Sequence, residues 1–114
     1  MTNKQTYLGE FEHLVLLSIY HLNANAYGVT IRQHLKKTID RDVSIGALYS
    51  TAERLEKKGY ITSKKGEAKA ERGGKAKRYF TITTKGLSSL TETRSKLESM
   101  WNTLPELYVQ GVSE

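Results

Sequence analysis

Residues 44–83 read SIGALYSTAERLEKKGYITSKKGEAKAERGGKAKRYFTIT, and this stretch decides the fold. Ser44 is a favourable N-cap and Gly59 a common helix end, so the sequence predicts a helix over residues 45–58. The runs 60–63 and 78–82 are rich in β-branched and aromatic residues, as strands are. The stretch therefore predicts a helix followed directly by an antiparallel hairpin with a long, glycine-containing tip.

Three further helices are predicted around this unit, over residues 7–22, 26–38 and 84–103, the last with Thr83 as N-cap. One stripe of the first helix, at helical spacing, comprises Leu8, Phe11, Val15, Ser18, Ile19 and Leu22. Leu14, Leu16 and Leu17 point away from that stripe. A domain this small rarely encloses a helix completely, so we expect a second chain to cover the extra face.

The predicted helix over residues 45–58 has two different faces. On a helical wheel its inner face comprises Ile45, Leu48, Ala52 and Leu55, and its opposite face comprises Gly46, Ala47, Ser50, Arg54 and Lys57, with Tyr49 on the boundary. Small residues at the N-terminal end allow a backbone to approach another surface closely. Helix-turn-helix proteins read bases by inserting the start of such a helix into the major groove.

Positive charge is concentrated in one part of the chain. Residues 57–85 contain ten Lys and Arg residues against Glu67 and Glu71, a local charge of +8, so the rest of this +6 chain carries −2. A basic patch of this kind is the usual electrostatic footprint of a polyanion partner. The patch is also compatible with a solvated loop kept soluble by lysine, and charge alone does not decide between the two.

The C-terminal helix carries its own apolar seam. Spacings of three and four connect Leu87, Leu90, Arg94, Leu97, Trp101 and Leu104, as in the a and d positions of a heptad. A seam on a protruding helix needs a partner surface, and the surplus apolar face of the first helix in a symmetric copy would supply one. The sequence therefore predicts a homodimer.

Together these elements predict a mainly α fold with a small β-hairpin. The order of three helices, hairpin and helix is that of a winged helix-turn-helix over residues 1–83, with a C-terminal dimerisation helix and tail over residues 84–114. In this plan the hairpin is the wing and lies along phosphates while the third helix enters the major groove of double-stranded DNA.

Several function classes are disfavoured by the composition. The chain has no cysteine, no signal peptide and no stretch long enough to cross a membrane, so we expect a cytoplasmic protein without membrane contact. Gly73-Gly74-Lys75 lacks the earlier glycine and the following Ser or Thr of a phosphate-binding loop, and no catalytic constellation stands out. The three histidines lack metal-ligand spacing. We expect no enzyme, no metal and no cofactor.

The chain also resembles a known family. The segments LGEFEHLVLLSI, AYGVTI, SIGALYSTAERLEKKGYI and ERGGKAKRYFTITTKG are similar to those of the PadR family of bacterial transcriptional regulators, of the short type with one C-terminal helix. The match runs from about Leu8 to Gly86. The resemblance implies a homodimer that binds a pseudo-palindromic operator, commonly as a repressor released by a small molecule or a stress signal. It implies that residues 44–57 read the DNA, that residues 72–79 form the wing motif, and that residues 84–104 form the dimer helix.

Two sets of candidate site residues follow. The expected DNA contacts are Tyr27, Ser44, Gly46, Ala47, Tyr49, Ser50, Arg54, Lys57, Arg72, Gly74, Lys75, Lys77 and Arg78. The candidate dimer interface, with a candidate pocket for a small hydrophobic effector, comprises Leu14, Leu17, Leu90, Leu97, Met100, Trp101 and Leu104.

Alternatives remain at the level of single residues and of the whole chain. Tyr49 either contacts DNA or packs between the third helix and the wing, and Tyr27 either contacts a phosphate or belongs to the core. The whole chain is alternatively a winged-helix module that binds a protein or RNA without an operator. The outer face of the third helix, with Gly46, Ala47, Ser50 and Arg54, lacks the apolar anchors expected of such a module.

Overall fold

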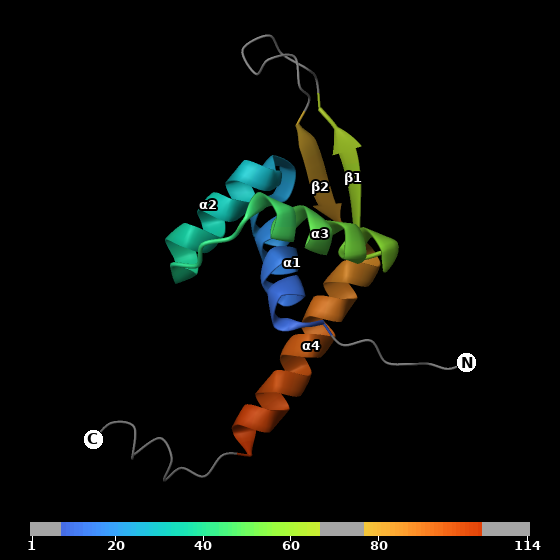
Figure 1. The fold of residues 1–114 in the computed structure, drawn as a ribbon. Helices are drawn as coiled ribbons and strands as arrows, with labels where there is room; N and C mark the ends of the chain where they lie inside the picture. Colours follow the sequence, from blue (N-terminus) through green and yellow to red (C-terminus); the bar gives the residue numbers. More distant parts are fainter. Residues whose placement is uncertain (1–7, 67–76, 104–114) are drawn as a thin grey trace.

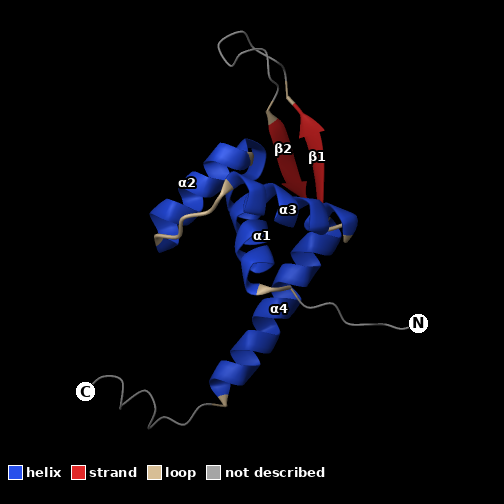
Figure 2. Cartoon of the chain, viewed as in Figure 1, coloured by secondary structure: helices blue, strands red, loops and turns tan. Residues whose placement is uncertain are grey.

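The computed structural model describes residues 8–66 and 77–103 of the 114-residue chain. The elements are α1 (Glu10–Leu22), a 3₁₀ turn (Asn23–Asn25), α2 (Gly28–Ile39), α3 (Ile45–Lys57), β1 (Ile61–Lys65), β2 (Arg78–Ile82) and α4 (Thr84–Asn102). Figures 1 and 2 show α1, α2 and α3 packed together, with the hairpin projecting from one end and α4 from the other. The predicted order of helices and strands, and the mainly α fold class, are confirmed.

The core surrounds α1, which contacts α2, α3, β2 and α4. Val15, Leu16 and Ile19 of this helix are fully buried, and Ile31, Leu48 and Leu55 meet them from α2 and α3. Leu16 lies off the predicted stripe, and the expectation that a second chain covers it is wrong, because its own chain buries it completely. The reason is that α1 is enclosed by other elements of its own chain on more than one side, so a single helical stripe understates its buried surface.

The helix ends follow from local sequence signals. The Ser44 hydroxyl accepts a hydrogen bond of 3.1 Å from the Ala47 amide, and the Thr83 hydroxyl accepts one of 3.0 Å from Gly86, so both predicted N-caps are confirmed. Gly59, directly after α3, has a φ of 83°, a left-handed conformation that favours glycine. These residues fix where α3 and α4 begin and where the chain turns into the hairpin.

The two strands pair antiparallel, with Ile61 opposite Ile82 and Lys65 opposite Arg78. The hairpin is also joined to the start of α2, because Tyr27 forms an isolated β-bridge with Tyr79 and the Phe80 amide donates a 2.8 Å hydrogen bond to the Ala26 carbonyl. Phe80 is buried beneath this junction. β2 is therefore held against the start of α2, and the hairpin does not hang freely from α3.

The first turns of α4 pack against the helical core, and the rest of the helix leaves it. Gly86, Ser89 and Leu90 are buried, whereas every described residue from Arg94 onward is exposed. Figure 1 shows the resulting arm, which extends away from the hairpin. The stripe that the sequence predicted on α4 thus begins in the chain's own core and continues onto an exposed surface.

Candidate nucleic-acid interface

The N-terminal end of α3 lies on the surface next to α2. Gly46, Ala47 and Ser50 are exposed, and Ser44 caps the helix from its N-terminus. The connection from α2 is held by the Arg32 Nε, which donates a 2.8 Å hydrogen bond to the Val43 carbonyl. The small face predicted for α3 is therefore accessible, and the loop that precedes it is fixed.

The buried face of α3 differs from the predicted one at two positions. Ile45, expected to point inward, is 43% exposed, and Thr51 is buried beside Leu48 and Ala52. Ile45 is the first residue of the helix and its Cδ1 lies beside Gly28 at the start of α2, outside the core. The remaining predicted core residues of α3, Leu48, Ala52 and Leu55, are all buried.

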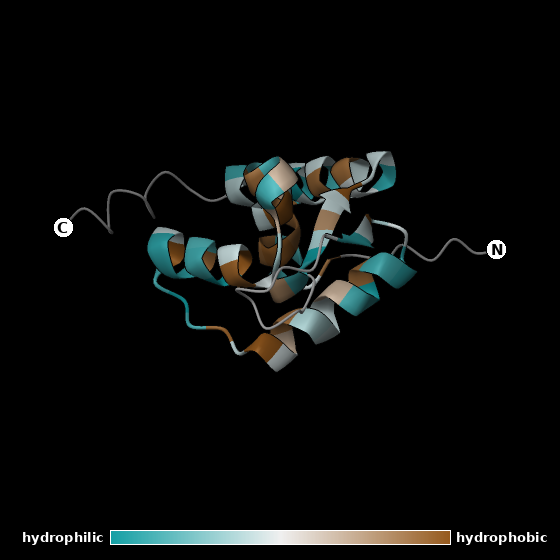
Figure 3. Cartoon of the chain, turned by 90° about the horizontal axis from the view of Figure 1, so that it is seen from above, coloured by the Kyte–Doolittle hydropathy of each residue, from teal (hydrophilic) through white to brown (hydrophobic). Residues whose placement is uncertain are grey.

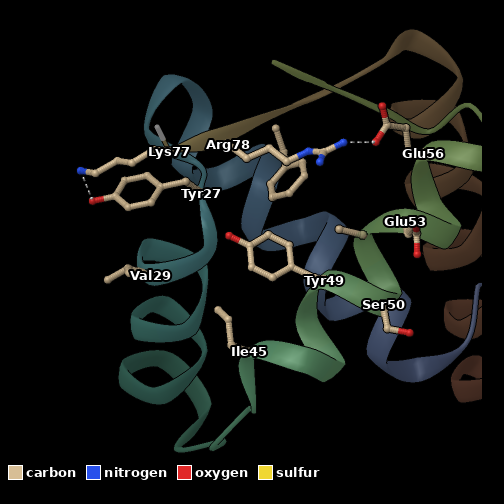
Figure 4. Close-up of a pocket in the computed structure, with 11 residues that line it drawn as sticks. Tyr27, Val29, Ile45, Tyr49, Ser50, Glu53, Glu56, Lys77 and Arg78 are labelled. Carbon is tan, nitrogen blue, oxygen red and sulfur yellow. Dashed lines mark hydrogen bonds and ion pairs between the residues drawn. The ribbon is translucent and has the colours of Figure 1, made fainter. Parts of the chain in front are cut away.

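A groove of about 770 Å³ runs between α2, α3 and β2 (Figure 4). Apolar and aromatic side chains form most of its wall, and two carboxylates and two cations line the rest. The lining residues are Tyr27, Val29, Ile45, Tyr49, Ser50, Ala52, Glu53, Glu56, Lys77, Arg78 and Phe80. In Figure 4, Ile45 and Tyr49 point from α3 toward α2. The groove joins the predicted reading helix to the predicted wing.

Tyr49 combines the two alternatives that the sequence left open. Its ring lies 6.2 Å from the ring of Phe80, centroid to centroid, so it packs between α3 and the hairpin. Its hydroxyl lies over Gly28, where a Cβ would be only 2.7 Å away. The side chain nevertheless stays exposed. Gly28 thus allows the tyrosine to rest against α2 while one edge of it faces solvent.

Tyr27 forms the junction between α2 and the hairpin. It is half-buried as the N-cap of α2, and its ring centroid lies 5.2 Å from that of Tyr79. The Lys77 ammonium donates a 2.9 Å hydrogen bond to the Tyr27 hydroxyl and lies 4.2 Å from the centre of its ring. A cation–π contact of this kind fixes the position of the lysine without neutralising its charge.

Two predicted DNA-binding arginines have acidic partners within the chain. The Arg78 Nη2 lies 3.7 Å from the Glu56 Oε1, and the Arg78 Nε donates a 3.2 Å hydrogen bond to the Ser63 hydroxyl. The Arg54 Nε lies 3.4 Å from the Glu12 Oε2. Both arginine side chains remain half exposed. These contacts hold the guanidinium groups at the surface.

Glu12 is the one buried carboxylate among the described residues. Burial favours its protonated form, but the Gly9 amide, the Lys58 ammonium and Arg54 all stabilise the charge, and the net result is a pKa below the ordinary value. Lys58 reaches both carboxylate oxygens at 3.1 Å. No sequence pattern indicates this pairing, because Glu12 and Lys58 are distant along the chain. The contact ties α1 to the end of α3.

Not every predicted DNA contact can be located. Lys57 is exposed on the last turn of α3, and no described residue forms an ion pair with it. Arg72, Gly74 and Lys75, predicted at the tip of the wing, lie outside the described residues. Val29, Glu53 and Glu56 line the groove but were not predicted. The sequence does not indicate these residues, because the groove exists only where α2, α3 and β2 meet in the fold.

The predicted dimer surface is divided between the core and solvent. Leu90 is buried in its own chain and Leu14 packs against the same core, so these two are largely covered without a partner. On the exposed arm of α4, Met100 is 70% and Trp101 60% exposed, and Leu97 is exposed as well. Leu17, on α1, is also exposed. Leu104 lies outside the described residues.

The histidines show no sign of metal binding. His21 and His34 stack with their ring centroids 4.7 Å apart, and no group of three or more potential ligands occurs in the described ranges 8–66 and 77–103. Burial lowers the pKa of His13, and burial together with the nearby His21 and Lys37 lowers that of His34.

Within residues 8–66 and 77–103, no helix has the length and apolar character needed to cross a bilayer.

Comparison with known proteins gives a consistent family and fold. Residues 16–92 match the model of the transcriptional regulator PadR-like family. A PadR-like transcription factor from Bacteroides fragilis is 26% identical, with a TM-score of 0.69, over 82% of this chain and 84% of its own. A PadR-like transcriptional regulator from Bacillus cereus is also 26% identical, with a TM-score of 0.67, over 86% and 90% of the two chains.

A transcriptional regulator from Clostridium thermocellum shows a similar likeness, with 26% identity and a TM-score of 0.65 over 78% of this chain and 83% of its own. Among curated protein sequences, none matches this chain significantly.

Proposed function

Because the chain belongs to the PadR-like family of transcriptional regulators, we propose that it binds a specific DNA operator and acts as a homodimeric repressor. The observation that carries this proposal is one groove, in which the exposed Ser50 of α3 lies on the same lining as Lys77 and Arg78 of the hairpin. The family consists of regulators, and we propose no enzymatic activity for this chain. Its action on DNA would place it in the cytoplasm of a bacterium.

In the proposed complex, α3 enters the major groove and the hairpin follows the phosphates. Gly46, Ala47 and Ser50 allow close approach, and Lys57 and Arg54 lie near the backbone at the end of α3. Lys77 and Arg78, at the end of the hairpin that leads into its tip, are held by Tyr27 and Glu56, so their charges are already in position. Such preorganisation reduces the side-chain entropy lost on binding.

The proposed dimer uses the exposed arm of α4. Leu97, Met100 and Trp101 form an exposed apolar surface there, larger than isolated exposed residues would give. A second copy would cover it with its own α4 and with Leu17 of its α1. We further propose that a small hydrophobic ligand binds among these side chains and releases the operator, since Trp101 and Met100 offer aromatic and thioether surface. The boundary at residue 83, between the winged helix-turn-helix and the dimerisation helix, stays a prediction.

Salt dependence tests the DNA-binding surface. The affinity of the full chain for a labelled random duplex should fall steeply with salt, by a slope of about −0.9 in log–log terms for each phosphate contact. Replacing Lys77 and Arg78 with Ala should reduce the magnitude of that slope and weaken binding to all sequences about equally. Fluorescence anisotropy between low and moderate salt measures both quantities.

A matched control removes the same charge elsewhere. Lys96 on α4 pairs with a glutamate at 3.5 Å, as Arg78 does on the hairpin, and Lys96→Glu lowers the net charge by two, as the double Ala variant does. The Lys96→Glu variant should bind as the parent does. Equal slopes for the two variants would contradict the assignment of Lys77 and Arg78 to the DNA surface.

One observation favours a second function. Ile45, Val29 and Tyr49 are exposed on the groove, so apolar anchors occur beside the outer face of α3, although that face itself has none. Such residues suit a winged-helix module that binds a protein. A flat salt dependence, or no binding to duplex DNA at low salt, would favour that module over the operator-binding regulator.

A further inference from the structure

The proposed reading surface lacks the side chains that usually identify bases by hydrogen bonds. Arginine recognises guanine, and asparagine or glutamine recognises adenine, through paired hydrogen bonds in the major groove. From Ile45 to Ser50 the exposed residues of α3 are Ile45, Gly46, Ala47, Tyr49 and Ser50, and none is of these types. Ser50 can hydrogen-bond to more than one kind of base and so specifies none by itself, and the first two turns of α3 must therefore discriminate bases chiefly in another way.

Apolar side chains occupy this position instead. Ile45 and Tyr49 of α3 both lie against Gly28, the first residue of α2, and Val29 of α2 lines the same groove. Figure 3 shows α3 hydrophobic at its N-terminal end and hydrophilic at its C-terminal end. The apolar end is the one that a helix-turn-helix protein directs toward base edges.

These apolar groups are held in place by the packing of α2 against α3. A Cβ at Gly28 would lie 3.3 Å from the Ile45 Cδ1 and 2.7 Å from the Tyr49 hydroxyl, so the glycine allows both side chains to rest against the α2 backbone. Phe80 supports Tyr49 from the hairpin side. A surface restrained in this manner keeps its shape when it meets a partner, which reduces the entropy lost on binding.

The surrounding charges indicate what kind of partner the apolar cluster meets. Lys77 and Arg78 line the same groove from the hairpin side and suit a phosphate beside a base-pair edge. Of the two carboxylates in the lining, Glu56 pairs with Arg78 at 3.7 Å, and Glu53 lies on α3. Within the major groove of DNA, the one apolar group that a base presents is the C5-methyl of thymine. An apolar cluster with cations on its hairpin side is therefore complementary to a thymine methyl group beside a backbone phosphate.

We propose that Ile45, with Val29 and Tyr49 beside it, reads thymine methyl groups, so that the operator half-site contains thymine where α3 begins. This inference rests on the proposed function and deepens it by naming the bases recognised. Each buried methyl group should contribute about a fourfold gain in affinity, the ratio expected for burying one methyl-sized apolar group. One such contact in each half-site of a dimer would multiply to more than tenfold.

The test uses the full chain and duplex DNA of random sequence. Repeated selection enriches the preferred sites, and each enriched site is then prepared with thymidine or with deoxyuridine, which pairs identically but lacks the methyl group. Deoxyuridine within the half-sites should lower the affinity more than tenfold. Deoxyuridine confined to the flanks should change nothing, and the salt dependence should be the same for both duplexes, since the phosphates are unchanged.

Two isoleucine variants separate a methyl contact from a general loss of apolar surface. Ile45 is 43% exposed and Ile39, at the other end of α2, is 46% exposed, so Ile45→Ser and Ile39→Ser remove similar groups from similar environments. The Ile45→Ser variant should bind thymidine and deoxyuridine sites with more nearly equal affinity. The Ile39→Ser variant should keep the full difference, and thermal unfolding of both variants shows that they are folded.

The outcomes are distinct. Enriched sites whose affinity is insensitive to deoxyuridine would overturn the methyl contact while leaving the DNA-binding regulator intact. A deoxyuridine effect that persists in the Ile45→Ser variant would overturn the assignment to this residue. If no site is enriched and random duplex is not bound at low salt, the proposed function itself fails, and the apolar cluster is assigned to a protein partner.

Discussion

Replacing Gly86 with Ala should destabilise the protein, although alanine is the better helix former. A Cβ at this position of α4 would lie 2.2 Å from the Tyr60 carbonyl oxygen and 2.9 Å from the Ile82 Cγ1. An ordinary contact begins at 3.4 Å, so α4 and the Tyr60 backbone would have to separate by about 1.2 Å, the difference between 3.4 Å and 2.2 Å. Tyr60 cannot move freely, because its carbonyl accepts a 3.0 Å hydrogen bond from the Thr83 amide.

The magnitude follows from three contributions. Overpacking costs about 1–3 kcal/mol, and weakening the Thr83 hydrogen bond costs about 1 kcal/mol. The higher helix propensity of alanine returns about 1 kcal/mol. The net loss of unfolding free energy should be about 2 kcal/mol, which corresponds to a fall in Tm of about 8 °C for a chain of this size.

A second glycine provides the control. At Gly46 of α3 a Cβ would have no neighbour within 4 Å, so Gly46→Ala should raise the unfolding free energy by about 0.5–1 kcal/mol. Urea denaturation followed by circular dichroism, at one fixed protein concentration, measures both variants. If Gly86→Ala proved as stable as the parent, the close packing of α4 on Tyr60 would be refuted.

Two further predictions concern the buried carboxylate and the exposed arm. Glu12→Gln should lower the unfolding free energy by about 1–3 kcal/mol at pH 7, because Lys58 loses its charged partner. Since the folded-state pKa of Glu12 is lowered, this stabilisation is present above about pH 4.5 and is lost as the pH falls through the folded pKa. The unfolding free energies of the parent and the variant should therefore converge in acid. A difference between them that stays constant with pH would contradict the pairing. Replacing Leu97 and Trp101 with Glu should yield monomers in light scattering, because charges would be buried in the seam. The control variant Ser95→Glu with Ser99→Glu, on other faces of the same helix, should have the mass of the parent. If the Leu97 and Trp101 variant stayed dimeric, the assignment of α4 to the dimer interface would be refuted.

The sequence by itself determined the order of the elements and the caps of α3 and α4, whereas α1 begins at Glu10 and not at residue 7, α2 spans Gly28–Ile39 and not 26–38, and β1 spans Ile61–Lys65 and not 60–63. Ser44, Gly59 and Thr83 stop or start helices through hydrogen bonds to neighbours a few residues away, and β2 spans the predicted residues 78–82. Signals of this kind depend on neighbouring residues, so they can be recognised from the sequence alone. The family resemblance rests on the same segments and is confirmed by the match over residues 16–92.

Only the tertiary structure decided which side chains face the core, the solvent or an acidic partner. Leu16 is buried and Ile45 exposed, against the helical wheel in both cases. Arg54 meets Glu12, which is remote in the sequence. Helical spacing gives the relative directions of side chains on one helix, but the number of sides that other elements cover depends on contacts between distant segments. For that reason the groove and its apolar cluster became visible only after α2, α3 and the hairpin were placed together.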